Sequence, residues 1–262
     1  KKENKVSVIV NGKSTDYSAK HIIIATGARS RELPNLPQDG KKVIGYREAL
    51  TLPKAPKKMV IVGSGAIGVE FAYFYNAMGV DVTIVEFMQN IVPVEDVDVS
   101  KQLQRSFKKS GIKIMTKSTV EKVDTSGTGC KVLVKTKKGE EIIECDVVLS
   151  AVGITANIEN IGLEEVGIKT DRGRILVDDF YQTNVNGYYA IGDVLPTHAL
   201  AHVASAEGIT CVEKIAGHSP EPIDYGNIPG CTYASPEIAS VGMTETAAKE
   251  AGYEIKVGKF PF

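Results

Sequence analysis

The pattern best suited to carry chemistry is a glycine-rich turn between an apolar strand and a helix. The strand MVIV leads into Gly63-Ser64-Gly65-Ala66-Ile67-Gly68. In a G-x-G-x-x-G turn the first glycine permits a tight bend, the second lets a pyrophosphate approach the backbone, and the third allows close packing of helix on strand. Free N–H groups at the helix N-terminus then favour the phosphates. The turn predicts a dinucleotide site; a turn used only for packing is the alternative.

An acidic residue closes the next apolar strand and bears on which dinucleotide is bound. Glu86 can accept hydrogen bonds from both hydroxyls of an adenosine ribose, and it would repel a 2′-phosphate. The residues after it, Phe87-Met88-Gln89-Asn90, include no Arg to receive such a phosphate. The pattern therefore favours NAD over NADP. Glu70, in the first turns of the helix, is either a cofactor contact or a partner of the helix dipole.

A second strand ends at an acidic residue further along the chain. Residues 188–193 (YYAIGD) end in Gly192-Asp193, and Thr197 is the expected N-cap of a helix over HALAHVASAEG. An Asp at the carboxyl end of a strand, beside a helix N-terminus, suits a polyhydroxyl chain, with the helix dipole directed at an electron-accepting ring. An Asp that merely caps a turn is the alternative.

Other chemistry-bearing residues form no complete motif. His198 and His202 share a helical face but have no acidic or Cys partner at ligand spacing, so we expect no metal site. Gly12-Lys13-Ser14 resembles the end of a phosphate-binding loop, but Ser7 stands where that loop requires Gly. The four cysteines, at 130, 145, 211 and 231, form neither a C-x-x-C pair nor a zinc set. They fit a reducing compartment.

The elements that must position these residues alternate in type. From Lys58 the chain reads strand, turn, helix, strand, then a helix near 96–110 and further strands around a hairpin. The predicted fold class is α/β, with doubly wound Rossmann-like nucleotide-binding domains that carry β-hairpin insertions and the start of an α+β interface domain. The expected divisions are 1–57, 58–153, 154–222 and 223–262.

An internal repeat bears on how much of each domain is present. Val6 and Val132, Ala25 and Ala151, and Gly27 and Gly153 are each 126 positions apart. The second copy has a glycine-rich turn upstream, whereas the first has no room for one, so we expect the chain to be an internal fragment. A chance likeness of two short β segments is the alternative.

Composition excludes some partners. Lys and Arg number 31 against 32 Asp and Glu, a net charge of −1, which gives no basic excess for nucleic acid. The most apolar stretch, Met59 to Val85, is interrupted by Glu70 and Asp81, so we expect no membrane-spanning segment.

Taken together, these motifs resemble those of the flavoprotein disulfide reductases over essentially the whole chain. The resemblance rests on HIIIATGA (21–28), GSGAIGVE (63–70), AVG (151–153), YAIGDV (189–194), ALAHVASAEG (199–208) and YASPEIASVGMTE (233–245). The last motif is most similar to the family members that oxidise protein-bound dihydrolipoamide. The resemblance implies FAD and NAD as cofactors, a homodimer, and as partner a lipoyl domain of a 2-oxo acid dehydrogenase complex or of the glycine cleavage system. It also implies a cytoplasmic location, or a mitochondrial or plastid one in a eukaryote.

The resemblance also implies roles for particular residues. Against FAD it places Thr26, Gly27, Ala28, Asp193, Ala199, Leu200, Ala201 and His202. Along the NAD site it places Gly63, Ser64, Gly65, Ala66, Ile67, Gly68, Glu70, Glu86, Val120 and Gly153.

Three departures limit what the resemblance implies. The family's C-x4-C redox pair and its C-terminal His-Glu pair have no counterpart here, so we expect no catalytic residue and no turnover from this chain alone. Where many relatives carry an Arg after AVG, this chain has Ile154-Thr155-Ala156-Asn157, and the resemblance does not define the contact there. The alternatives are another family member, such as a glutathione, mercuric or soluble pyridine nucleotide reductase, or a non-catalytic NAD-binding module.

Overall fold

The computed structural model describes residues 4–260, which form two compact units. The first unit runs through Arg29 and resumes over Ile154–Ile228; the second consists of Ser30–Gly153 and the residues from Pro229 onward. The sequence divisions were expected after residues 57, 153 and 222, whereas the two compact units divide after residues 29, 153 and 228.

A parallel sheet forms the centre of the second unit. Its strand order is β5 (Val43–Ile44), β12 (Val147–Ser150), β6 (Lys58–Val62), β7 (Asp81–Val85) and β8 (Lys113–Met115). Because β5 pairs with β12, it forms the edge strand of this sheet, and α1 (Tyr46–Leu50) follows it. The chain changes direction between β6 and β12, and ligands of doubly wound folds bind beyond the carboxyl ends of such strands.

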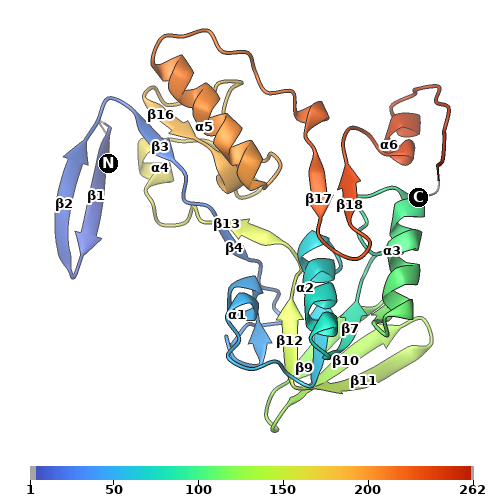
Figure 1. Cartoon of the computed structure of the whole chain (residues 1–262). Helices are drawn as coiled ribbons and strands as arrows, with labels where there is room; N and C mark the ends of the chain where they lie inside the picture. The colour runs from blue at the N-terminus through green and yellow to red at the C-terminus, as the bar shows by residue number, and fades with distance from the viewer. Residues whose placement is uncertain (1–3, 261–262) are drawn as a thin grey trace. The chain divides into compact units, whose positions relative to one another are not determined.

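Alternating side chains of the sheet supply two separate cores. On β6, Met59 and Ile61 pack with α2 (Ala66–Ala77) and α3 (Val97–Lys109), while Val60 and Val62 pack on the opposite face. An antiparallel layer covers that face: β9 (Thr119–Asp124), β10 (Cys130–Thr136) and β11 (Gly139–Cys145). Helices thus lie on one side of the sheet and the predicted hairpin insertion on the other (Figure 1).

The C-terminal segment packs on the helical side of the second unit. It contains β17 (Gly230–Thr232), β18 (Ile238–Ser240) and α6 (Glu245–Glu250). Ala234 and Ile238 are buried in the core that α2 and α3 share. The Ser106 hydroxyl donates to the carbonyl oxygen of Ser235 at 2.9 Å, which fastens the segment to α3.

The first unit is smaller and contains several short strand pairs. β3 (Ile22–Ile24) pairs in parallel with β16 (Tyr188–Ala190), and β4 (Ala28–Ser30) pairs with β13 (Ile154–Ala156). These segments lie far apart in the sequence. Around them are hairpins β1–β2 (Lys5–Val10, Lys13–Ser18) and β14–β15 (Thr170–Asp171, Arg174–Ile175), helices α4 (Leu163–Val166) and α5 (Ala201–Ile215), and 3-10 turns η1 (Gly192–Val194) and η2 (Tyr225–Asn227).

Within residues 4–260, no helix combines the length and the apolar character needed to cross a membrane.

Candidate dinucleotide sites

The glycine-rich turn lies directly after β6, and two of its glycines are required by close backbone packing. Gly63 has φ +96°, and a Cβ there would strike the carbonyl oxygen of Ala151, at the end of the neighbouring strand β12. A Cβ on Gly68 would strike the carbonyl oxygen of Gly63. Gly65 differs, because a Cβ there would meet no heavy atom within 4 Å. The first and third glycines therefore serve the fold, and the second leaves open space beside the turn.

That open space adjoins the N-terminus of helix α2. The helix runs over Ala66–Ala77 with Gly65 as its N-cap, and no side chain in the described part of the chain caps it. The first N–H groups of a helix have no acceptor within the helix. The space beside Gly65, the uncapped N–H groups and the helix dipole together form a cradle that fits a pyrophosphate.

Glu86 lies beside this turn and is hydrogen-bonded to it. Its side chain is only 6% exposed. Oε2 accepts from the backbone N–H of Ser64 at 2.8 Å and from the Ser64 hydroxyl at 2.6 Å, while Oε1 accepts from the Met88 N–H at 2.6 Å. A carboxylate has about four acceptor positions, so one remains open on Oε1. Two ribose hydroxyls could both bond only if the Ser64 hydroxyl rotates away.

Other expected NAD-site residues have structural roles of their own. Glu70, on α2, accepts from the Tyr233 N–H at 2.8 Å, a contact with the C-terminal segment that neither sequence interpretation included. Val120 is buried among the valines beneath the sheet, and its carbonyl accepts from Asn35. Gly153 has φ +110° and accepts from the Arg31 N–H at 3.0 Å.

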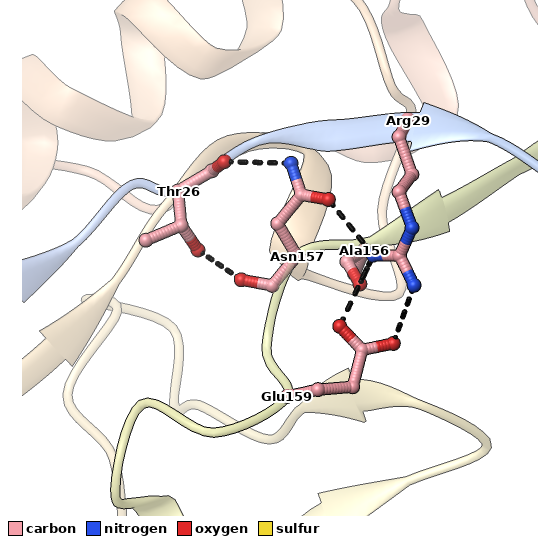
Figure 2. Close-up of polar contacts among 5 residues, drawn as sticks. All are labelled: Thr26, Arg29, Ala156, Asn157 and Glu159. Carbon is pink, nitrogen blue, oxygen red and sulfur yellow. Dashed lines mark hydrogen bonds and ion pairs between the residues drawn. The ribbon is translucent and has the colours of Figure 1, made fainter.

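In the first unit, the Thr26–Ala28 segment is bonded to the segment after β13. The Thr26 hydroxyl donates to the carbonyl oxygen of Asn157 at 2.6 Å, and the Asn157 side-chain amide donates to the carbonyl oxygen of Thr26 at 3.0 Å. The Asn157 N–H also donates to the Gly27 carbonyl. Figure 2 shows how these reciprocal bonds join the two chain segments.

Arg29 completes this cluster by bonding to the segment that follows AVG. Its guanidinium donates to Asn157 Oδ1 at 2.9 Å and to both Glu159 oxygens, at 2.8 and 3.1 Å (Figure 2). This bidentate ion pair lowers the pKa of Glu159 from 4.5 to about 2. The family resemblance had not predicted this contact between Arg29 and Glu159.

The Arg29–Glu159 pair predicts a pH effect. The folded pKa of Glu159 lies below its unfolded value, so the pair's contribution to stability is present above about pH 4.5 and is lost as the pH falls towards about 2. We expect the Glu159 carboxyl resonance to titrate near pH 2 in an NMR experiment, and at a distinctly higher pH in Arg29→Gln, where only the backbone hydrogen bonds still lower its pKa. Arg31→Gln is the matched control and should leave the Glu159 titration unchanged. An equal midpoint in all three proteins would contradict the pairing.

The Gly192–Asp193 turn is held by a buried acid that the sequence analysis did not select. Glu207, on α5, is fully buried. Its Oε2 accepts from the Gly192 N–H at 2.6 Å, and its Oε1 accepts from the Thr197 hydroxyl at 2.9 Å and the Tyr225 hydroxyl at 2.7 Å. Burial, together with its bonds to Tyr181 and Glu207, raises the pKa of Tyr225 well above its usual range. Asp193 itself is half-buried, and its carbonyl accepts from Arg174.

The expected start of helix α5 was wrong. Thr197 was predicted as the N-cap, but α5 begins at Ala201 with Leu200 as N-cap, and the Thr197 hydroxyl donates to Glu207. Ala199 and Leu200 therefore precede the helix, while Ala201 and His202 form its exposed first turn. Across the described residues no side chain caps α5, so its N-terminus fits an electron-rich group, such as a flavin ring carrying negative charge.

The cysteines of the chain offer no activated nucleophile at either site. Cys130, Cys145 and Cys211 are buried, and burial raises the pKa of each thiol, that of Cys145 to about 12 and that of Cys211 to about 11. Among the described residues no group of His, Cys, Asp and Glu could hold a metal ion.

A glycine-rich turn at the switch point of a parallel sheet, closed by a buried acid, defines a dinucleotide-binding α/β protein. Comparison with known families narrows this class. The model for pyridine nucleotide-disulphide oxidoreductases matches residues 1–208, and the model for their dimerisation domain matches residues 228–262. The chain belongs to the pyridine nucleotide-disulphide oxidoreductase family.

Individual relatives agree with this assignment. The chain is 51% identical to the dihydrolipoyl dehydrogenase of Rhizobium etli, over 97% of its own length and 53% of the relative's. It is 46% identical to the mitochondrial dihydrolipoyl dehydrogenase of Pisum sativum, over 97% of its own length and 51% of the relative's. The crystal structure of LpdA from Mycobacterium tuberculosis matches with a TM-score of 0.86 at 30% identity, covering 94% of this chain and 53% of that one. The chain thus spans about half the length of the curated relatives it matches.

Proposed function

We propose that this chain is the nucleotide-binding part of a dihydrolipoyl dehydrogenase, an enzyme that oxidises protein-bound dihydrolipoamide with NAD⁺ by way of a redox disulfide and FAD. The similarity to enzymes of that name supports the proposal, and so does the spacing of the motifs. The observation that carries it is the turn of Gly63 to Gly68, which leaves space at Gly65 beside an uncapped helix and Glu86.

In this proposal the second unit binds NAD. The N–H groups at the start of α2 bind the pyrophosphate, and the open acceptor position of Glu86 receives a ribose hydroxyl. The first unit contributes to the FAD site through Thr26, Gly27, Ala28, Asp193 and Ala199 to His202. FAD, when bound, supplies two-electron transfer between the disulfide and the nicotinamide. The Asn157 and Glu207 bonds orient the two backbone segments that would contact it.

The proposal predicts a preference between the two nicotinamide cofactors. NADP⁺ would set its 2′-phosphate against the buried Glu86, and such like-charge contacts cost several kcal/mol, so we expect about 100-fold weaker binding than for NAD⁺. Calorimetric titration measures both affinities. Glu86→Gln keeps the side chain's size and removes its charge, so the ratio should fall to about tenfold or less. An unchanged ratio in that variant would show that Glu86 does not select the cofactor.

The whole-enzyme activity needs its own test, in the full-length protein that contains this chain. We expect it to reduce NAD⁺ with dihydrolipoamide and to leave glutathione disulfide and Hg(II) unreduced with NADPH. Turnover with either of the latter, and none with dihydrolipoamide, would identify another reductase of the family. NAD binding without turnover on any of these would favour a non-catalytic module.

The assembly and location of the enzyme follow from the same proposal. The match of residues 228–262 to a dimerisation domain supports a homodimer. A lipoyl domain of a 2-oxo acid dehydrogenase complex or of the glycine cleavage system is the proposed protein partner. We propose the cytoplasm of a bacterium as the location, or the mitochondrion or plastid of a eukaryote, which the mitochondrial relative supports.

A further inference from the structure

We propose that Cys130 and Cys145 form a thiol pair that a small disulfide oxidant can convert into a cross-strand disulfide, an oxidisable site in the hairpin beneath the nucleotide-binding sheet. The two residues are direct partners in the antiparallel pairing of β10 with β11. They are 15 positions apart, so they do not fit a local C-x-x-C motif. Only the strand register brings them together.

The register meets the geometric requirement for a disulfide. Directly opposed residues of an antiparallel pair have Cα atoms about 4.5 or 5.5 Å apart, and both values lie within the range of about 4.4–6.8 Å found for disulfides. Opposed side chains also share one face of the sheet. Both cysteines pack into the core beneath the sheet with Val132 and Val134. Each thiol also perturbs the pKa of the other, as near neighbours do.

Burial slows reaction of the two thiols, and a surface cleft lies beside them. Cys130 is 2% exposed and Cys145 6%, and burial raises the pKa of both thiols, which slows attack by a thiolate. Yet both residues line a surface cleft of about 540 Å³, together with the Ser126–Gly129 loop. The Cys130 thiol faces the carbonyl oxygens of Lys42 and Asp146 at 3.8 and 3.7 Å, which are weak contacts that a disulfide can give up. In this proposal the cleft is the route by which a small oxidant approaches the pair.

The reaction is an ordinary exchange. One cysteine loses its proton and its sulfur attacks the small disulfide, whose first half leaves and takes up a proton; the second cysteine then attacks the mixed disulfide and releases the second half as a thiol. Two S–H bonds and the oxidant's S–S bond break, while one protein S–S bond and two S–H bonds form. The cysteines are oxidised by two electrons, and the oxidant is reduced to two thiols.

The test uses the chain with Cys231→Ser, because Cys231 is exposed and would form mixed disulfides of its own. The folded protein is incubated with glutathione disulfide, alkylated and digested with trypsin. Cleavage after Lys131 and Lys138 puts the two cysteines on separate peptides. We expect one linked peptide pair, lighter than the two separate peptides by two hydrogen atoms and separated again by a dithiol. Cys211, which is equally buried, should remain open to alkylation after unfolding.

Matched variants separate pairing from general oxidation. Cys211→Ser should leave the linked peptide pair unchanged, whereas Cys145→Ser should abolish it and leave Cys130 as a thiol or as a mixed disulfide with glutathione. The absence of a linked pair in the folded protein would overturn the proposal, as would a Cys130 mixed disulfide that persists while Cys145 is present. The peptide map needs neither variant, so a folding failure of Cys145→Ser leaves the test intact. The result does not depend on NAD binding, so it stands apart from the proposed function.

Discussion

Replacing Glu207 with Ala is expected to open the Gly192–Asp193 turn. The substitution removes the fully buried carboxylate that accepts from the Gly192 N–H and from the half-buried Thr197 and Tyr225 hydroxyls, and Tyr225 keeps its contact with the Tyr181 hydroxyl. Buried donors without a partner cost about 1–3 kcal/mol each, and part of that cost is relieved when the turn opens to water. We therefore expect the free energy of local opening around this turn to fall by about 3 kcal/mol.

Hydrogen exchange followed by mass spectrometry is the suitable measurement, because two units need not unfold together. Exchange of the amides around 188–207 should accelerate about 100-fold, while those of β6 and α2 in the other unit keep their wild-type rates. Glu207→Gln is the matched control: its amide oxygen still accepts, so the acceleration should be about tenfold. Equal exchange in wild type and Glu207→Ala would show that the three bonds do not hold the turn.

The sequence predicted the second unit better than the first. Strand, turn and helix from Lys58 to Glu86 follow one another without a gap, and each position obeys a local rule: apolar residues form the strand, glycines the turn, and an acid closes the next strand. Such a segment can be recognised from neighbouring residues alone. The fold class was confirmed for this reason, including the hairpin insertion.

What could not be predicted depends on contacts between distant positions. Arg29 and Glu159 are 130 positions apart, and Glu207 reaches Gly192 across a turn whose course no local pattern specifies. Thr197 shows the limit most clearly, because its type suits an N-cap, yet the helix begins only at Ala201 and the Thr197 hydroxyl donates to the distant Glu207. The hydrogen bond from the Ser64 hydroxyl to Glu86 could not be predicted either, because the turn motif assigns no role to the side chain at its second position. For Glu207, the available signal was an acidic residue within the otherwise small and apolar Ala206-Glu207-Gly208 sequence of α5.

Gly65 and Gly68 of the turn should respond differently to the same added methyl group. In Gly65→Ala the new Cβ meets nothing within 4 Å, and the residue's φ of −65° suits alanine, so the fold should persist. The methyl group would instead occupy the space proposed for the pyrophosphate. Losing about two charge-assisted hydrogen bonds to the phosphates should weaken NAD⁺ binding about 100-fold or more.

Gly68→Ala serves as the contrasting variant. Its Cβ would strike the Gly63 carbonyl oxygen, a backbone atom that cannot move without displacing α2 from the sheet, so we expect a stability loss of about 3 kcal/mol. Calorimetric NAD⁺ titration, read alongside hydrogen exchange of β6 and α2, separates the two effects. Gly65→Ala should lose affinity at wild-type exchange rates, whereas Gly68→Ala should lose both affinity and protection. If Gly65→Ala binds NAD⁺ as wild type does, the pyrophosphate does not lie at this turn, and the proposed NAD site must be abandoned even though the fold is right.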